Sequence, residues 1–171
     1  MFLTPPLLQE RGWVRLNHSS DQMKNLFHKE AYEEIIERLS LLNRASVGKW
    51  GIMTVSQMLA HCAEVLNVPL HDKKQPRLFI GRIVGWALKK RLYDDIPFKR
   101  NLPTATNFRI SNEREFVEEK TKLQKMVDEF FNKGPEGAGR HPHPMFGSFT
   151  TEQWGMSMYK HLDHHLRQFG V

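Results

Sequence analysis

Apolar side chains recur at intervals of three and four residues along four long stretches of this chain, and this spacing constrains the fold more than any other feature. Such spacing gathers apolar groups on one face of an α-helix. These faces must pack against each other to remove their apolar surface from water. It predicts helices over residues 21–43, 54–67, 112–132 and 151–169. No segment shows the strong alternation of apolar and polar residues that indicates a strand. We therefore expect an all-α protein, built as a four-helix bundle.

The ends of these helices carry recognisable sequence signals. Three of them begin with Thr or Asn followed three residues later by Gln or Glu, a pair that caps a helix start; the pairs are Thr54 with Gln57, Asn112 with Glu115, and Thr150 with Gln153. Pro69 is expected to end the second helix, and Gly134 with Pro135 the third.

The connection between the second and third helices, residues 68–110, is long for a helical bundle. Its first part, residues 78–93, again has helical spacing and predicts an extra helix. Its second part, residues 97–111, contains two prolines and is expected to be an extended loop. The predicted architecture is thus a four-helix bundle with one long crossover that carries an extra helix.

Length and composition are those of one soluble domain. The chain has 171 residues, of which 40% are hydrophobic and 26% charged. Its single cysteine, Cys62, can form no intramolecular disulfide, which favours a reducing, cytoplasmic location. No apolar run approaches the roughly 20 residues of a membrane span. The apolar start lacks the basic residues of a signal peptide.

Positive charge gathers in one segment. The formal net charge is +6, and residues 71–110 contain ten Lys or Arg against three acidic residues. A basic segment of this kind, with aromatic residues interleaved, can bind an anionic small ligand, a nucleic acid or a membrane surface. It can also serve as a lid or a dimer element. Because no nucleic-acid-binding motif is present, we do not expect a nucleic-acid partner.

Histidines form the most distinctive chemical pattern. His161 and His165 are four residues apart on the last predicted helix, so both imidazoles can reach one metal ion. His164 is an alternative ligand. His61 lies within the apolar pattern of the second helix, and helical bundles build metal sites from side chains that project inward from facing helices. Each part of this pattern has a simpler interpretation. His61 can be a hydrogen-bonded core histidine, and the last helix can have a histidine-rich surface.

Three segments resemble a known family: residues 50–62 (WGIMTVSQMLAHC), 143–147 (HPMFG) and 154–170 (WGMSMYKHLDHHLRQFG). They are similar to an uncharacterised branch, domain of unknown function 1569, of the DinB/YfiT-like superfamily. The resemblance covers residues 23–171 as a single bundle domain and leaves residues 1–22 as an N-terminal extension. It implies a four-helix bundle, often dimeric, with a metal site of three histidines.

Carried onto this sequence, the metal ligands implied by the resemblance are His61, His161 and His165. Some relatives in the superfamily transfer low-molecular-weight thiols to electrophiles, and others were proposed to be hydrolases. The superfamily commonly has Arg-Gly-Gln after the last ligand, whereas this chain has Leu166, Arg167 and Gln168. The long basic crossover is a second departure, so a thiol substrate does not follow from the resemblance alone.

Other residues near the expected site have two readings each. Glu64, one turn after His61, is a candidate general base or a helix-surface group. Gln168 is a candidate for orienting a ligand or substrate, or a packing residue. His143 is expected at the mouth of the site or in a turn. Cys62 is expected to fill the core.

The resulting hypothesis is a metal-dependent enzyme. A divalent ion, Zn²⁺ or Ni²⁺ with Fe or Mn as alternatives, would leave positions open for a water or a thiol, as three-histidine catalytic sites do. The expected partners are a small-molecule substrate, such as a low-molecular-weight thiol, and a second copy of the chain. The competing hypotheses are a non-enzymatic helical binding or stress-response module, and an anionic-ligand-binding protein that uses residues 71–110.

Overall fold

The structure, a computed structural model, describes residues 23–71, 89–140, 142–143 and 146–171. This part of the chain contains four α-helices and two short 3₁₀ turns and no strand: α1 (Lys29–Leu41), α2 (Val55–Leu70), η1 (Lys90–Leu92), η2 (Thr106–Phe108), α4 (Phe116–Gly137) and α5 (Thr151–Gln168). The all-α prediction is confirmed.

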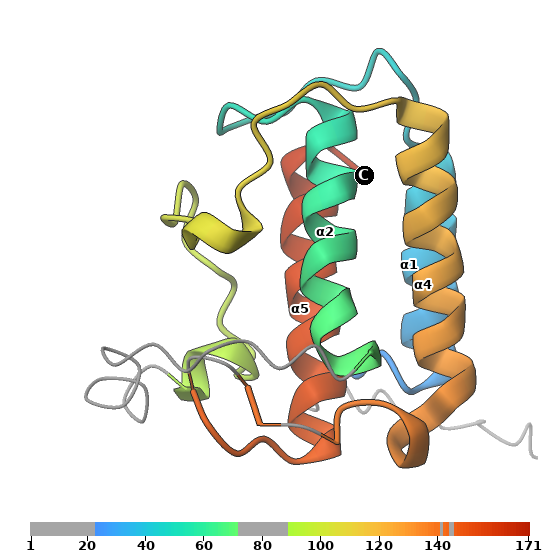
Figure 1. Cartoon of the computed structure of the whole chain (residues 1–171), viewed down its shortest axis with the longest axis vertical. Helices are drawn as coiled ribbons and strands as arrows, with labels where there is room; N and C mark the ends of the chain where they lie inside the picture. Colours follow the sequence, from blue (N-terminus) through green and yellow to red (C-terminus); the bar gives the residue numbers. More distant parts are fainter. Residues whose placement is uncertain (1–22, 72–88, 141, 144–145) are drawn as a thin grey trace, which may run out of the picture.

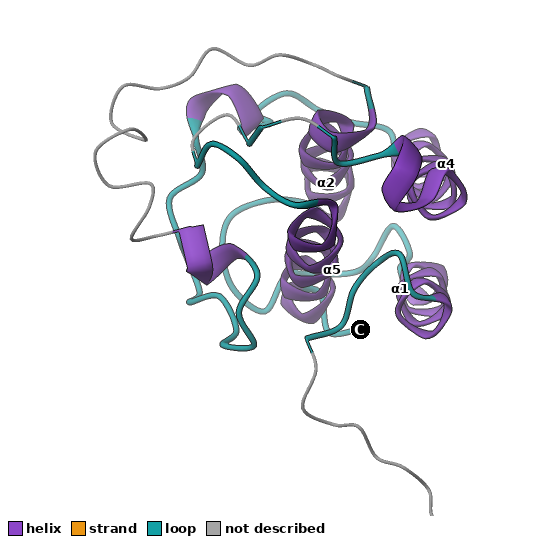
Figure 2. Ribbon diagram, turned by 90° about the horizontal axis from the view of Figure 1, so that it is seen from below, coloured by secondary structure: helices purple, strands orange, loops and turns teal. Residues whose placement is uncertain are grey.

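The four helices stand side by side as a bundle (Figure 1). Seen along their axes, α2 and α4 form one side, and α5 and α1 form the other (Figure 2). The described part of the crossover between α2 and α4 runs along the outside of α2 and α5, away from α1 and α4. The described part of the crossover covers this face of the α2–α5 pair with loop and the two short 3₁₀ turns.

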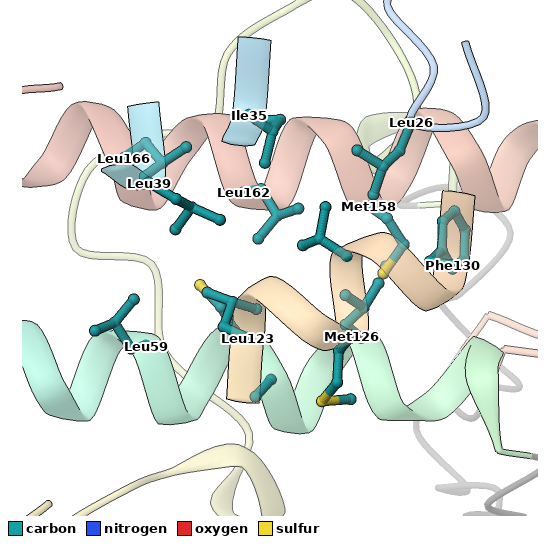
Figure 3. Packing of buried hydrophobic residues seen from close by; sticks show 14 of the residues in the cluster. Leu26, Ile35, Leu39, Leu59, Leu123, Met126, Phe130, Met158, Leu162 and Leu166 are labelled. Atoms are coloured by element: carbon teal, nitrogen blue, oxygen red, sulfur yellow. The ribbon is translucent and has the colours of Figure 1, made fainter. Parts of the chain in front are cut away.

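The core fills the space between the helices with side chains that repeat at helical spacing (Figure 3). On α5, four apolar residues at intervals of four are buried; they are Trp154, Met158, Leu162 and Leu166. Ile35 and Leu39 of α1 and Leu123 of α4 meet them and have no exposed surface. Burying each side chain of this size stabilises the fold by about 1.5–3 kcal/mol. This packing fixes α5 relative to the other helices.

Two of the predicted capping boxes are confirmed. At the start of α2, Gln57 N–H donates to Thr54 Oγ1 at 3.2 Å, and Thr54 N–H donates to Gln57 Oε1 at 3.0 Å. Thr150 and Gln153 form the same reciprocal pair at the start of α5. Both helices that carry the candidate histidines thus have a start fixed by local sequence.

The predicted box at Asn112 is wrong. Helix α4 begins at Phe116, and its N-cap Glu115 makes no capping hydrogen bond with its side chain. The carboxylate of Glu115 instead pairs with Arg44 of the α1–α2 connection, at 3.0 Å. The Glu115 side chain therefore forms a long-range ion pair, where the local sequence pattern predicted a capping hydrogen bond.

The first helix begins later than predicted, at Lys29 and not near residue 21. Leu26 is fully buried, yet it lies in a turn before the helix, where its N–H donates to the carbonyl of Gly155 at 3.1 Å. The Asn25 side chain accepts a hydrogen bond from Phe27 N–H at 2.9 Å, which closes this turn. The apolar pattern marked burial correctly here, but the backbone is not helical.

Of the two predicted proline stops, the one at Pro69 is wrong, and the one at Gly134 is confirmed as a break in the helix. Pro69 lies inside α2, which continues to Leu70. Because Pro69 is in the last turn, only one helical bond is lost, and His71 N–H still donates to the carbonyl of Asn67 at 3.1 Å. Helix α4 is interrupted at Gly134, whose φ of 60° is not helical, but a helical turn containing Pro135 follows to Gly137.

The extra crossover helix predicted over residues 78–93 falls mostly on residues 72–88, which lie outside the described residues, as do residues 1–22. From residue 89 onward the chain forms the turn η1 and then a loop. None of the helices in the described part of the chain combines the length and the apolar character needed to cross a membrane.

A buried lysine attaches η1 and the following loop to α5. The Lys160 ammonium donates to the carbonyls of Arg91 and Asp94, at 2.7 and 3.0 Å, and to the Asp94 carboxylate at 2.5 Å. It also lies 4.6 Å from the centroid of the Phe98 ring. Only 4% of the Lys160 side chain is exposed, so this ion pair is well shielded from water.

Candidate metal centre

The bundle brings together the three histidines that the sequence singled out. His61 projects from the middle of α2, and His161 and His165 project from neighbouring turns of α5. One ring nitrogen from each lies within 4.8 Å of the other two. The same three residues were implied by the family resemblance. Within the described residues, they are the group of three ligand side chains close enough together to hold a metal ion.

The crossover fixes the tautomer of His61. Its Nδ1 lies 2.9 Å from the backbone carbonyl oxygen of Phe108, in η2. A carbonyl oxygen can only accept, so Nδ1 must carry the proton. In the neutral ring the lone pair is then on Nε2, the atom that faces the other histidines. A backbone carbonyl behind a ligating histidine is a common support of metal sites.

Two hydrogen bonds in series through Gln168 fix the tautomer of His165. Its Nδ1 lies 2.8 Å from Gln168 Oε1, and Gln168 Nε2 donates to the carbonyl of Trp50 at 2.7 Å. The carbonyl determines which end of the amide is the donor, so Oε1 accepts from His165 Nδ1–H. The lone pair of His165 is therefore also on Nε2. Gln168 is 3% exposed, so this hydrogen bond to His165 is shielded from water.

Glycine is required beside these hydrogen bonds. Gly51 has φ 79°, a left-handed conformation, and a Cβ at this position would lie 2.6 Å from Gln168 Nε2. Any side chain would push the amide away from the carbonyl of Trp50. Glycine at position 51 thus allows the hydrogen bond between Gln168 and the carbonyl of Trp50.

The spacing of the nitrogen atoms fits a shared cation. His61 Nε2 and His161 Nε2 are 3.1 Å apart. Two lone pairs at this distance repel each other unless one nitrogen keeps a proton or both point at a positive ion. Two nitrogens bound to one tetrahedral ion at about 2.0–2.1 Å are roughly 3.3–3.4 Å from each other, close to the observed separation. The donor set, three imidazoles with two tautomers fixed for ligation, suits a divalent transition metal.

Burial keeps these rings neutral. It lowers the pKa of His61, although the bond to the Phe108 carbonyl partly opposes this, and it lowers the pKa of His165 to about 3. Burial, followed by the neighbouring histidines, holds the pKa of His161 well below its usual range. Neutral imidazole is the form that binds a metal, so the environment favours the ligating state.

Two cavities adjoin the cluster and share His165. The larger, of about 630 Å³, reaches His165 and Gln168 and is bounded by Trp50, Phe108 and Arg109. The smaller, of about 250 Å³, reaches all three histidines and has a mainly apolar wall, which includes Val65, Leu92, Phe98, Leu102 and Met158. Their volumes are those of small-molecule sites or parts of one. The crossover supplies the outer wall of both cavities.

Two further histidines line these cavities without joining the cluster. His164 lies between Trp50 and Phe98, with its ring centroid 5.7 Å from each, and lines both cavities. His143 lines the smaller cavity, as expected for a residue at the mouth of the site, and stacks on Trp154 at 5.2 Å. The three close nitrogens belong to other residues, so neither is needed to complete the cluster.

The His143 environment predicts a pH-dependent stability. Burial lowers the pKa of His143 to about 4, whereas the unfolded chain should titrate near 6.5. Between these values the unfolded state binds more protons, so the contribution of His143 to stability is complete above pH 6.5. It is lost as the pH falls toward 4, by at most about 1.4 kcal/mol for each pH unit.

The measurement is the free energy of unfolding in urea at pH 7 and pH 5, with a chelator present. His143→Asn keeps an oxygen that can accept from Phe146 N–H, as His143 Nδ1 does at 3.3 Å. This variant should lose less stability between the two pH values than the unchanged protein. An identical loss in both proteins would show that His143 is not the titrating group.

Glu64 and Cys62 lie elsewhere on α2. The Glu64 carboxylate pairs with Lys122 of α4 at 3.2 Å, and Glu64 is not among the residues that line the two cavities. Cys62 is buried in the core, and its Sγ contacts Met58 Sδ at 3.7 Å. Burial raises the pKa of this thiol, which suits a packing role and not a nucleophile.

Sequence reasoning missed the two backbone carbonyls that set the tautomers. They belong to Phe108 and Trp50, which are 47 and 118 residues from the side chains they contact. Every residue has a carbonyl, so no residue type marks them. The nearest signal is Gly51, which allows the close approach of Gln168.

The fold and the site define a helical-bundle protein with a buried three-histidine cluster able to hold a metal ion. The chain belongs to the family described as Protein of unknown function (DUF1569), whose model matches residues 20–170. The match covers all four helices and all three histidines. Comparison with curated proteins and with solved structures found no match. These comparisons give no link to the DinB/YfiT-like superfamily.

Proposed function

We propose that this protein is a metal-dependent enzyme whose divalent ion, Zn²⁺ or Ni²⁺, is held by His61, His161 and His165. The observation that carries the proposal is the convergence of His61 Nε2 and His161 Nε2 to 3.1 Å, with the opposite nitrogen of His61 bonded to a carbonyl. One hydrogen bond between His61 and His161 would satisfy a pair of core histidines, but the nitrogen of His165 also lies within 4.8 Å of both, as a shared ion requires. Three protein ligands also leave coordination positions open, which is typical of catalytic sites.

The residues around the cluster have separate tasks. Phe108 and Gln168 orient two of the imidazoles, and the apolar wall of the smaller cavity limits the access of water. When bound, the ion would supply Lewis acidity, which lowers the pKa of a water or thiol that it coordinates. The cavities beside it would hold the reactants.

Between thiol transfer and hydrolysis, the cavity linings favour thiol transfer. The residues described around the two cavities include no Asp or Glu to act as a general base for water. A thiol bound to such an ion would be fully deprotonated at neutral pH, whereas a bound water would keep a pKa near 7 and would gain more from a base. In the proposed reaction the sulfur forms a bond to an electrophilic carbon, the leaving group departs with the bonding electron pair, and the thiol proton passes to bulk water.

Metal content tests the proposal. The full chain, purified without a histidine tag, should contain about one equivalent of a divalent transition metal by elemental mass spectrometry. His61→Ala should reduce this to a trace. Gln168→Ala leaves the three ligands in place but frees His165 Nδ1, so its metal affinity should fall by about 10–100-fold.

His28→Ala is the matched control, because His28 is exposed and its side chain makes no capping bond. It should keep the metal content of the unchanged protein. The proposal fails if added Zn²⁺ and Ni²⁺ bind the unchanged protein no better than they bind His61→Ala. The transfer reaction is tested separately, by screening the metal-loaded protein for thiol consumption with a set of alkylating electrophiles. If no thiol is consumed, the transfer reaction is rejected but the metal site is not.

A further inference from the structure

A third cavity, of about 350 Å³, adjoins the candidate metal centre and is rich in positive charge. It shares Trp50 and His164 with the larger cavity. Four cationic side chains and one carboxylate line it; they are Lys49, Arg100, Lys160, Arg167 and Asp163. The function proposed above gives no role to this charge.

Two of these cations are already neutralised. Lys160 pairs with Asp94 at 2.5 Å, and Arg167 pairs with Asp163 at 2.9 Å. Asp163 also accepts from Arg38 at 2.8 Å, so its charge is more than matched and does not compensate the rest of the cavity.

Lys49 and Arg100 remain without a carboxylate partner among the described residues. The Arg100 guanidinium carbon lies over the Trp50 ring, 4.6 Å from its centroid. A stacked guanidinium keeps its N–H groups for a carboxylate or phosphate, and a side chain already held in place loses less freedom when it binds. Lys49, next to Trp50 in sequence, adds a second positive charge on the same cavity.

We propose that Lys49 and Arg100 form an anion subsite, and that the small molecule handled at the three-histidine cluster carries a carboxylate or phosphate group bound there. The anionic group would lie on these two cations, and the rest of the molecule would pass over Trp50 and His164 toward His165. These two aromatic rings line both cavities, which makes them the connection between subsite and cluster. The identity of the molecule as a reactant rests on the proposed function; the subsite itself does not.

Binding of simple anions tests the subsite. The probes are benzoate, phenyl phosphate and the neutral benzyl alcohol, titrated into the full chain while the indole N–H signal of Trp50 is followed by NMR. Metal-free protein in a chelator is used first, because the two cations do not depend on a metal ion. Benzoate or phenyl phosphate should bind at least tenfold more tightly than benzyl alcohol, and the tighter of the two anions identifies the group. The affinity should fall as salt is added.

The double variant Lys49→Gln/Arg100→Gln should weaken anion binding by at least tenfold and keep the thermal unfolding midpoint of the unchanged protein. Lys29→Gln/Lys125→Gln changes the net charge by the same amount at exposed positions on α1 and α4 and should bind as the unchanged protein does. Equal affinities in the first variant and the unchanged protein, equal losses in both variants, or no preference for anions would each overturn the subsite.

Metal content of the same samples separates the two proposals. A protein that binds the anions through Lys49 and Arg100 but takes up no metal would keep the subsite and reject the enzyme. A protein that takes up metal through His61 but binds no anion would do the reverse.

Discussion

Lys160→Met should lower the free energy of unfolding by about 3–5 kcal/mol, because it leaves the Asp94 carboxylate buried without its closest cation. The side chain of Asp94 is 9% exposed, and the other cation near it, Arg91, is 3.9 Å away. The carbonyls of Arg91 and Asp94 also lose their donor. Urea unfolding followed by circular dichroism, with a chelator present, measures the difference.

Two companion variants give this prediction a clear outcome. Lys125→Met, at an exposed position of α4, should change the unfolding free energy by no more than about 0.5 kcal/mol. Lys160→Met/Asp94→Leu removes both charges and should recover much of the loss, because an apolar pair needs no compensation. A loss below about 1 kcal/mol in Lys160→Met would show that the ion pair contributes little.

Gly155→Ala should destabilise the protein by about 3 kcal/mol, although alanine is the better helix former. A Cβ on Gly155 would lie 1.9 Å from Asn25 Oδ1 and 2.7 Å from a ring carbon of Phe27. Asn25 is 2% exposed, and Phe27 stacks on Phe130 with centroids 4.4 Å apart, so neither can move away cheaply. The turn before α1 would have to separate from α5.

The sign of the change decides this prediction. Helix propensity alone would make Gly155→Ala more stable by about 1 kcal/mol. The unfolding midpoint in urea should instead fall. Asn25→Ala/Gly155→Ala removes the closest contact and should be more stable than Gly155→Ala. An unchanged or raised midpoint in the single variant would mean that the turn is not packed tightly on α5.

The fold was predictable where its signals are local. The apolar spacing located four helices, and the reciprocal Thr and Gln pairs located the starts of α2 and α5. The prediction failed where a distant partner competes. Glu115 pairs with Arg44 and does not complete a cap, and Leu26 is buried by a turn on α5 and not by a helix. Periodicity reports which residues are buried and cannot show which backbone conformation buries them.

The candidate site was likewise predictable where its signals are local in sequence and not where they depend on distant contacts. The four-residue spacing of His161 and His165, with His61 in an apolar helix, was visible in the sequence, and the structure brings the three together. Gln168 was a candidate for orienting a ligand or substrate, with packing as the alternative, and in the structure its side chain is buried and bonds His165. The cavities were not predictable, nor was the placement of Lys49 and Arg100, which have no carboxylate partner in the described part of the chain. Both depend on how the crossover lies against α2 and α5.

The acceptor behind His61 has a consequence for how sequences of this kind can diverge. It is the peptide carbonyl of Phe108, so replacing the Phe108 side chain leaves the bond to His61 Nδ1 in place. Insertion or deletion of a residue within η2 would instead move the carbonyl itself. We therefore expect position 108 to tolerate exchange of residue types more readily than η2 tolerates changes in length. Related chains would then keep this part of the site through the spacing of residues along the chain and not through the identity of any side chain.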